Sequence, residues 1–208
     1  MRNKIRFVEQ TILDAEDVFE RKKNLRAYMK ERRGQNENRD IKEKLLIENF
    51  FKAVFPETVS TDSKRTFFIY LSFSSEAPTD VLIEKLLERD CDVYCPRIEN
   101  GQMQAVQYAE DFSLSDYGIR EPIGKNFQGE LDVIVLPLLA VDEKGNRLGY
   151  GKGYYDAYLR AHPSAKRIGY CYDFQICNNV PMEEHDEKID VIVTDKRIID
   201  TAREVADD

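Results

Sequence analysis

The sequence has few of the side chains on which most protein catalysis depends. Its 208 residues include no tryptophan, two histidines and four cysteines. Histidine is the commonest general base, so a histidine-centred acid–base mechanism is a poor expectation here. The spacings between the cysteines match no common zinc site, and these residues are Cys91, Cys95, Cys171 and Cys177. We therefore predict free structural thiols and a chemistry that depends on positioning and charge.

Long apolar runs are also missing. No segment approaches the roughly 20 consecutive apolar residues that cross a bilayer. The first residues, Met1 to Arg6, lead into mixed charge instead of an apolar signal core. The sequence therefore predicts no membrane partner and a cytoplasmic location, where thiols stay reduced.

Positive charge is not in excess, because 31 Lys and Arg against 39 Asp and Glu give a net charge of −8. A nucleic-acid-binding protein should show a dominant basic surface, so we expect no nucleic-acid partner. Local sites for small anions remain compatible with this charge. The length suits one domain over 1–208, and a chain of this size can bury about two thirds of its unfolded surface. Residues 1–20 are expected to form a partly disordered N-terminal extension, in which weak signals over the first ten residues predict fraying. We expect a monomer or a weak homodimer.

Two helices are expected before the first strand. Residues 11–34 have apolar positions near a 3.6-residue period, acids at the start and bases at the end. Thr11 or Asp14 would cap this helix, and Gly34 would end it. A second amphipathic pattern runs over residues 41–54.

Compact apolar runs follow from Arg65 onward. They suit strands covered on both faces, and they lie at 67–71, 93–95, 133–136, 167–171 and 191–193. Helices expected over 79–89 and 153–161 give the strand–helix–strand order of a parallel sheet with right-handed crossovers. Residues 103–108 should form a hairpin with the strand at 93–95, because Asn100-Gly101 is a turn signal. The predicted fold class is α/β: one Rossmann-like domain of three layers, with a mostly parallel sheet flanked by helices.

A glycine-rich segment carries the clearest sign of chemistry. Four glycines lie over 145–153, after a predicted buried strand and before a helix, which is where α/β proteins bind ligands. Glycines let backbone N–H groups approach an anion, and Arg147 and Lys152 would add full charges to the same phosphates. Gly153 stands where a Walker A loop has the Ser or Thr that holds magnesium, so another residue must bind any metal. Asp156, one turn into the helix, is the nearest carboxylate.

The alternative is a tight connection that binds nothing, with Arg147 and Lys152 as solvated charges. The adjacent Tyr154-Tyr155 and Asp156 make the segment more specific than that. Asp142 is expected to stabilise the turn that follows it, over residues 143–146, through its side-chain oxygen and not to bind metal. Residues 145–159 closely resemble the signature of the 5-formyltetrahydrofolate cyclo-ligases, also called methenyltetrahydrofolate synthetases.

The resemblance extends from about Arg21 to Asp195. It implies ATP-dependent cyclisation of 5-formyltetrahydrofolate to 5,10-methenyltetrahydrofolate, with release of ADP and phosphate and with Mg²⁺ as cofactor. Two alternatives stay open. One is a sugar-phosphate isomerase or CoA-transferase-like enzyme of related fold, and the other is a non-catalytic folate- or nucleotide-binding protein.

The resemblance also implies roles for individual residues. Arg147 and Lys152 would be catalytic, and Asp156 and Asp186 would bind magnesium. ATP would contact Lys22, Arg26, Arg147, Leu148, Gly149, Tyr150, Gly151, Lys152, Gly153, Tyr154 and Tyr155. The folate would contact Leu71, Glu76, Tyr117, Tyr150, Gly151, Lys152, Gly153 and Tyr154. Taken alone, Glu76 has a commoner interpretation, as an acid in the first turn or cap of the following helix.

Overall fold

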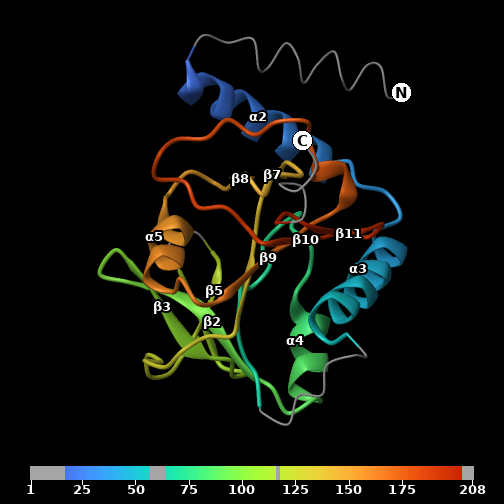
Figure 1. Ribbon diagram of the computed structural model, residues 1–208. Helices are drawn as coiled ribbons and strands as arrows, with labels where there is room; N and C mark the ends of the chain where they lie inside the picture. The colour runs from blue at the N-terminus through green and yellow to red at the C-terminus, as the bar shows by residue number, and fades with distance from the viewer. Residues whose placement is uncertain (1–16, 57–63, 116–117, 203–208) are drawn as a thin grey trace.

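The computed structural model describes residues 17–56, 64–115 and 118–202 (Figure 1). The predicted caps Thr11 and Asp14, most of the 1–20 extension and Tyr117 lie outside these residues. Within these ranges, no helix has both the length and the apolar character that a membrane crossing requires.

Two long helices come before the first strand, as predicted. They are α2 (Val18–Gly34) and α3 (Arg39–Val54). A single helix over 11–34 is wrong, because Asp17 is extended and is the N-cap of α2. Its carboxylate accepts a hydrogen bond from the N–H of Phe19 at 3.3 Å, which satisfies one of the unpaired donors at the start of a helix.

A seven-stranded sheet with the order β11-β10-β9-β6-β1-β2-β3 forms the centre of the molecule. All five predicted strands are present and pair in parallel: β1 (Thr66–Ile69), β2 (Asp92–Glu99), β6 (Val133–Leu136), β9 (Lys166–Tyr170) and β10 (Val191–Val193). Antiparallel strands form both edges, and they are β3 (Gln102–Gln107) and β11 (Ile198–Asp200). The predicted hairpin of β2 and β3 is therefore confirmed, whereas β11 was not predicted.

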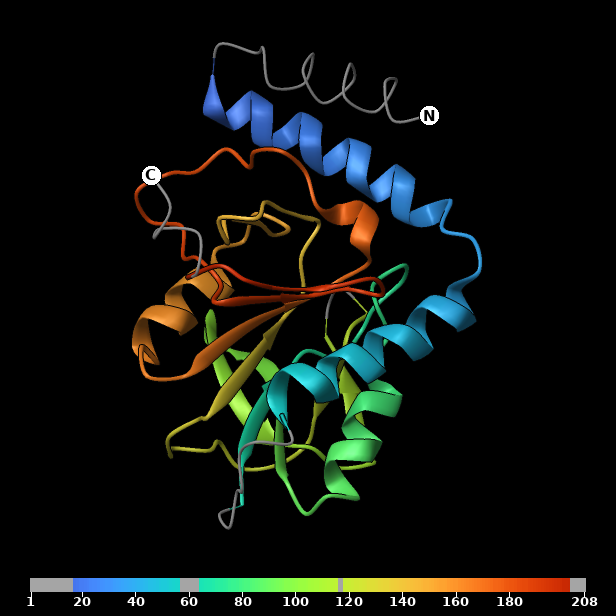
Figure 2. The same cartoon turned by 45° about the vertical axis from the view of Figure 1, so that its right-hand side comes forward.

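Helices cover both faces of the sheet (Figure 2). One face carries α3 and α4 (Asp80–Leu87), whose buried Phe50 and Ile83 belong to one apolar cluster with the strands. The other carries α5 (Tyr154–Ala161), where Leu159 packs in a second cluster. These clusters are the main source of stability, since burial of one large apolar side chain contributes about 1.5–3 kcal/mol. The three-layer α/β fold is confirmed.

Helix α2 lies across the edge of the sheet at which the parallel strands end (Figure 1). It packs on a third, smaller cluster, in which Leu25 and Met29 contact Leu148 and its neighbours. Below it are a 3₁₀ turn (Asp173–Gln175) and a hairpin of β7 (Ala140–Val141) with β8 (Arg147–Leu148). A second short hairpin joins β4 (Phe112–Leu114) to β5 (Arg120–Pro122).

The turn between β7 and β8 depends on Asp142, as predicted. This carboxylate is 1% exposed. It accepts hydrogen bonds from the N–H groups of Lys144 at 3.0 Å, Asn146 at 3.1 Å and Val180 at 2.9 Å. Asp142 therefore fixes the turn and also ties the segment around Val180 to it.

The four cysteines are buried and none forms a disulfide within the described residues, which confirms the prediction of structural thiols. Burial raises the pKa of Cys95 and of Cys171. Because the thiolate is the reactive form, these two side chains serve packing and not nucleophilic chemistry.

Candidate functional site

The glycine-rich loop joins β8 to α5 at the carboxyl edge of the sheet. Gly151 and Gly153 have φ values of 93° and 72°, which residues with a side chain rarely adopt. A Cβ atom on Gly151 would also lie 3.2 Å from the guanidinium of Arg26. Glycine at 151 therefore permits the turn and leaves room for a cation from α2.

The outer side of this loop is accessible. Tyr150, Gly151, Lys152 and Gly153 are exposed, and Gly153 is the N-cap of α5. No side-chain oxygen caps α5 at this position, so an anion can accept hydrogen bonds from the first N–H groups of the helix.

Two cations of α2 point at the loop and at a third segment near residue 185. Arg26 donates through Nε to the carbonyl of Gly149 at 3.0 Å. Lys22 is 4% exposed, and its Nζ contacts Glu183 Oε2 at 2.7 Å and also Asp186. Burial lowers the pKa of Arg26, and the charges of Asp186 and Glu183 oppose this shift. The structure thus places on one helix, at positions i and i+4, two of the side chains that the family resemblance assigns to ATP.

Arg147 and Asp156 form an ion pair inside the site. Arg147 Nη2 lies 2.7 Å from Asp156 Oδ1, and the two side chains are 3% and 16% exposed. The same oxygen accepts from the N–H of Glu187 at 3.1 Å. Arg147 Nε is buried and has no hydrogen-bond partner among the residues that the structure describes. A buried donor without a partner is unfavourable, so this nitrogen marks a place where a ligand oxygen would be stabilised.

The segment from Glu183 to Glu187 supplies acids from a distant part of the chain. The ligand atoms of Glu183, His185 and Asp186 lie within 4.8 Å of one another. The backbone N–H of Glu187 donates to the Asp156 carboxylate. Asp156 and Asp186, the two acids predicted to bind the metal, therefore come from neighbouring segments. Carboxylate oxygens are the donors that Mg²⁺ prefers, so Glu183 and Asp186 suit the predicted ion, whereas Asp156 is not among the three grouped residues. The sequence analysis did not single out Glu183.

A hollow of about 480 Å³ opens beside these acids. This size falls in the range of small-molecule sites. Its lining includes Asn146 from the turn and two acids that contact Lys22, and the full set is Val18, Arg21, Asn146, Asn179, Val180, Pro181, Met182, Glu183, Asp186 and Lys188.

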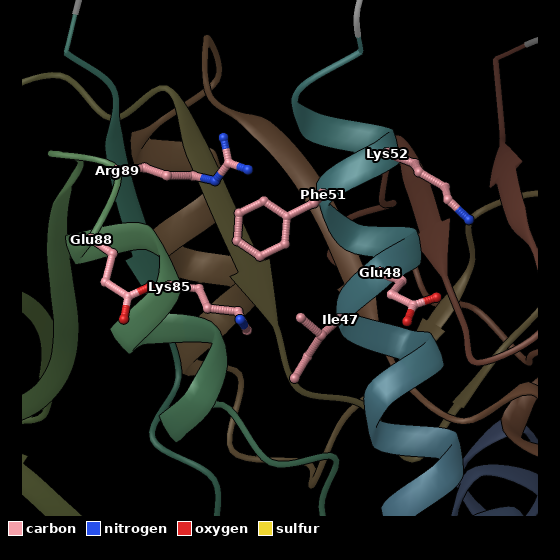
Figure 3. A pocket seen from close by; sticks show the side chains of 7 residues that line it. All are labelled: Ile47, Glu48, Phe51, Lys52, Lys85, Glu88 and Arg89. Atoms are coloured by element: carbon pink, nitrogen blue, oxygen red, sulfur yellow. The ribbon is translucent and has the colours of Figure 1, made fainter.

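A larger hollow of about 660 Å³ lies between α3 and α4 (Figure 3). Phe51 and Ile47 form its apolar part, and Arg89 lies 4.9 Å from the Phe51 ring. None of the predicted site residues lines it, so the chemistry of the glycine loop does not extend there.

Glu76 lies in the segment after β1 and is 7% exposed. Its Oε2 accepts from the N–H of Phe73 at 2.9 Å. The interpretation of Glu76 as a helix cap is wrong, because α4 begins at Asp80 and its N-cap is Thr79. Burial raises the pKa of Glu76, while hydrogen bonds from Tyr150 and Phe73 and the charge of Arg33 oppose the rise. This carboxylate is therefore joined to the glycine loop through Tyr150.

Leu71 and Arg33 are two further buried residues near Glu76. Leu71 is 3% exposed and belongs to the large apolar cluster on the face covered by α3 and α4.

The sequence analysis did not predict Arg33 as a site residue, and it used Arg33 only as one of the bases at the end of the first predicted helix. Its Nη2 donates to the Tyr150 hydroxyl at 2.6 Å. The available signal was its spacing from Lys22 and Arg26, which puts all three on one side of the helix.

Replacing Glu76 by glutamine is expected to stabilise the fold at neutral pH. Burial raises the pKa of this carboxyl, so the folded state holds the proton more tightly and its stability falls as pH rises through the folded pKa. We expect Glu76→Gln to raise Tm at neutral pH, because the amide keeps the size of the side chain and has no charge to desolvate. The gain should shrink as the pH is lowered. Thermal unfolding across a pH series measures this, and a lower Tm for the variant at neutral pH would contradict it.

Comparison with known proteins agrees with this geometry. The profile of the 5-formyltetrahydrofolate cyclo-ligase family matches residues 18–195. The 5-formyltetrahydrofolate cyclo-ligase of Mus musculus is 31% identical over 191 residues, which cover 83% of this chain and 92% of the mouse protein. A probable 5-formyltetrahydrofolate cyclo-ligase of Caenorhabditis elegans is 30% identical over 195 residues, covering 85% and 93%.

A solved structure agrees as well. The NMR structure of 5,10-methenyltetrahydrofolate synthetase from Aquifex aeolicus superposes with a TM-score of 0.73 at 28% identity, covering 86% of this chain and 92% of that one. The family match includes α2, the glycine loop and the acidic segment. The chain therefore belongs to the 5-formyltetrahydrofolate cyclo-ligase family.

Proposed function

We propose that this protein cyclises 5-formyltetrahydrofolate to 5,10-methenyltetrahydrofolate with ATP and Mg²⁺, and that it releases ADP and phosphate. The proposal rests on four cations that lie in or beside the glycine loop and the acidic segment, and they are Lys22, Arg26, Arg147 and Lys152. Their neighbours are the carboxylates of Asp156 and Asp186 and, on the other side of the loop, the buried carboxylate of Glu76. Four buried cysteines that form no disulfide within the described residues suit a reducing compartment, and we propose the cytoplasm. A monomeric or weakly dimeric state stays a prediction.

The ATP phosphates are proposed to bind on the exposed side of the glycine loop. The first N–H groups of α5 would donate to them, and Arg147 and Lys152 would add full charges. Arg26 already contacts the loop carbonyl of Gly149, so its charge lies next to the same place. Asp156 and Asp186 would hold Mg²⁺, which when bound neutralises charge on phosphate oxygens.

The folate is proposed to lie against Glu76, whose carboxylate would accept hydrogen bonds from the N–H groups of the pterin. Leu71, Tyr117 and loop residues 150–154 would complete this side. In the reaction, the formyl oxygen attacks the γ-phosphorus and ADP leaves. N10 then attacks the formyl carbon, phosphate departs with the former formyl oxygen, and the N10 proton is lost. Phosphoryl transfer of this kind needs alignment and charge neutralisation, which these residues supply without a protein nucleophile.

One assay tests the proposal. Absorbance of 5,10-methenyltetrahydrofolate should appear only when 5-formyltetrahydrofolate, ATP and magnesium are all present, with one ADP formed for each product molecule. Product without ATP hydrolysis, or ligand binding without any product, would refute the proposal. The second result would instead support the non-catalytic binding protein.

Lys152→Ala and Arg147→Ala should differ in their effect on stability. Each removes a cation from the proposed phosphate site, so kcat should fall by about 10²-fold or more. Lys152 is exposed, and its loss should leave Tm nearly unchanged. Arg147→Ala should also lower the stability by ~3 kcal/mol, because it leaves the Asp156 carboxylate without its cation. Steady-state kinetics and thermal unfolding of both variants measure the difference. Near-normal activity of both would argue against the phosphate site.

Asp156→Asn should raise the magnesium concentration needed for half-maximal activity, because the amide keeps the size of the side chain and loses the charge that attracts Mg²⁺. Asp142→Asn is the matched control. Its amide N–H₂ would face the donors that now bind Asp142, so Tm should fall while the magnesium requirement stays normal. Magnesium titrations and melting curves of both variants decide. The opposite pattern would transfer the metal assignment to Asp142.

A further inference from the structure

Arg33 lies where α2, the glycine loop and the segment after β1 meet. It is 4% exposed. Its guanidinium donates to the Tyr150 hydroxyl at 2.6 Å, to Ser75 Oγ at 3.2 Å and to the carbonyl oxygen of Leu138 at 3.4 Å. All three partners are neutral, so hydrogen bonds to oxygen atoms satisfy this buried guanidinium. The nearby carboxylate is that of Glu76, on which the charge of Arg33 acts.

Tyr150 connects these two charges. Its hydroxyl is hydrogen-bonded to both Arg33 and Glu76, and its ring centre lies 5.6 Å from the Arg33 guanidinium carbon. Burial raises the pKa of the Tyr150 hydroxyl, which therefore keeps its proton at neutral pH. A protonated phenol can accept from the guanidinium and donate to the carboxylate at once.

Within the described part of the chain, the other groups that face Glu76 supply no further side-chain cation to its carboxylate. Tyr70 at the end of β1 and Tyr155 on α5 are neutral hydroxyls whose pKa values are raised by burial. Arg39 on α3 donates to the main-chain carbonyl of Glu76 at 3.0 Å. Among the described residues that shift the pKa of Glu76, Arg33 is the one cation.

We propose that Arg33 is a positioning residue, which fixes Tyr150 and Glu76 in one arrangement between the folate side and the ATP side of the site. The inference rests on the proposed role of Glu76 in folate binding. Arg33 would not touch the reacting atoms. It would set the direction of the carboxylate that binds the folate and, through Tyr150, the position of the loop that binds ATP.

Kinetics of three variants test this. Arg33→Met removes the charge and the donors, and Arg33→Lys keeps the charge without the planar fork of donors. Arg32→Met is the matched control, because it removes the same group from the next position of α2, where it donates to the carbonyl of Phe174 at 3.2 Å. We expect Arg33→Met to raise KM for 5-formyltetrahydrofolate about tenfold or more, the loss typical of one charge-assisted hydrogen bond. KM for ATP should rise less, Arg33→Lys should recover part of the loss, and Arg32→Met should behave as wild type.

The pH dependence separates positioning from a general structural role. If Glu76 must be ionised to bind the folate, activity falls as the pH drops through its pKa. Loss of the Arg33 charge raises that pKa further, so the acid limb of kcat/KM for the folate should move to higher pH in Arg33→Met. A merely structural defect would reduce the amount of active enzyme and leave this limb in place.

A direct titration makes the test independent of turnover. Side-chain ¹³C resonances of glutamate can be followed against pH by NMR, with Glu76→Gln to assign the signal. The pKa of Glu76 should be higher in Arg33→Met than in wild type. If Arg33→Met does not fold, Tyr150→Phe and Arg33→Lys replace it, and the titration should shift upward in Tyr150→Phe.

The outcomes are distinct. An unchanged Glu76 titration together with an unchanged KM for the folate, in folded variants, would overturn the role of Arg33. If the wild-type protein makes no methenyltetrahydrofolate, the proposed function fails, whereas the NMR titration still reports whether Arg33 acts on Glu76. A shifted titration with normal folate KM would overturn the positioning role and retain only the electrostatic contact.

Discussion

Charged side chains buried on α2 need ion-pair and hydrogen-bond partners, and the segments that supply these partners form the carboxyl edge of the sheet. A buried ammonium or guanidinium is tolerated only when oxygen atoms satisfy it, and α2 buries both Lys22 and Arg33. The partners of Lys22 come from the acidic segment, and those of Arg33 come from the glycine loop and the turn after β1. Segments far apart in the sequence are therefore held against a single helix, while the small cluster around Leu25 and Met29 fixes how closely the helix approaches.

Two of the cations of the site already form ion pairs within the protein. Lys22 contacts Asp186, and Arg147 contacts Asp156. In the proposed reaction these same groups bind phosphates and magnesium. A nucleotide with its metal ion brings both signs of charge, so phosphate oxygens can take the place of carboxylates at the cations while the metal takes the place of cations at the acids. Charge balance is then kept in both states, and a buried site need not pay the full desolvation cost of unpaired charge.

Much of the fold followed from the sequence because its signals are local. The runs at 133–136 and 191–193 are buried on both faces and match β6 and β10 residue for residue. Strand β11 gave no such run, since it is short and Ile198 is 40% exposed. The two-residue strands of the β7–β8 hairpin are equally short. The helix predicted over 11–34 failed at Asp17, where capping by a carboxylate overrides the periodic pattern.

The site was predictable where its residues are contiguous and not where it depends on tertiary packing. The glycines, Arg147 and Asp156 are neighbours in the sequence, but the role of Arg33 depends on which face of α2 is buried and on a loop more than 100 residues away. Arg33 follows Lys22 by eleven positions, and a rise of 1.5 Å per residue sets them about 16 Å apart along one helix. One end of α2 contacts the acidic segment and the other contacts the group that leads to Glu76. A single helix therefore fixes the separation of the two proposed substrate sites, and a fixed separation is what transfer between two bound substrates requires.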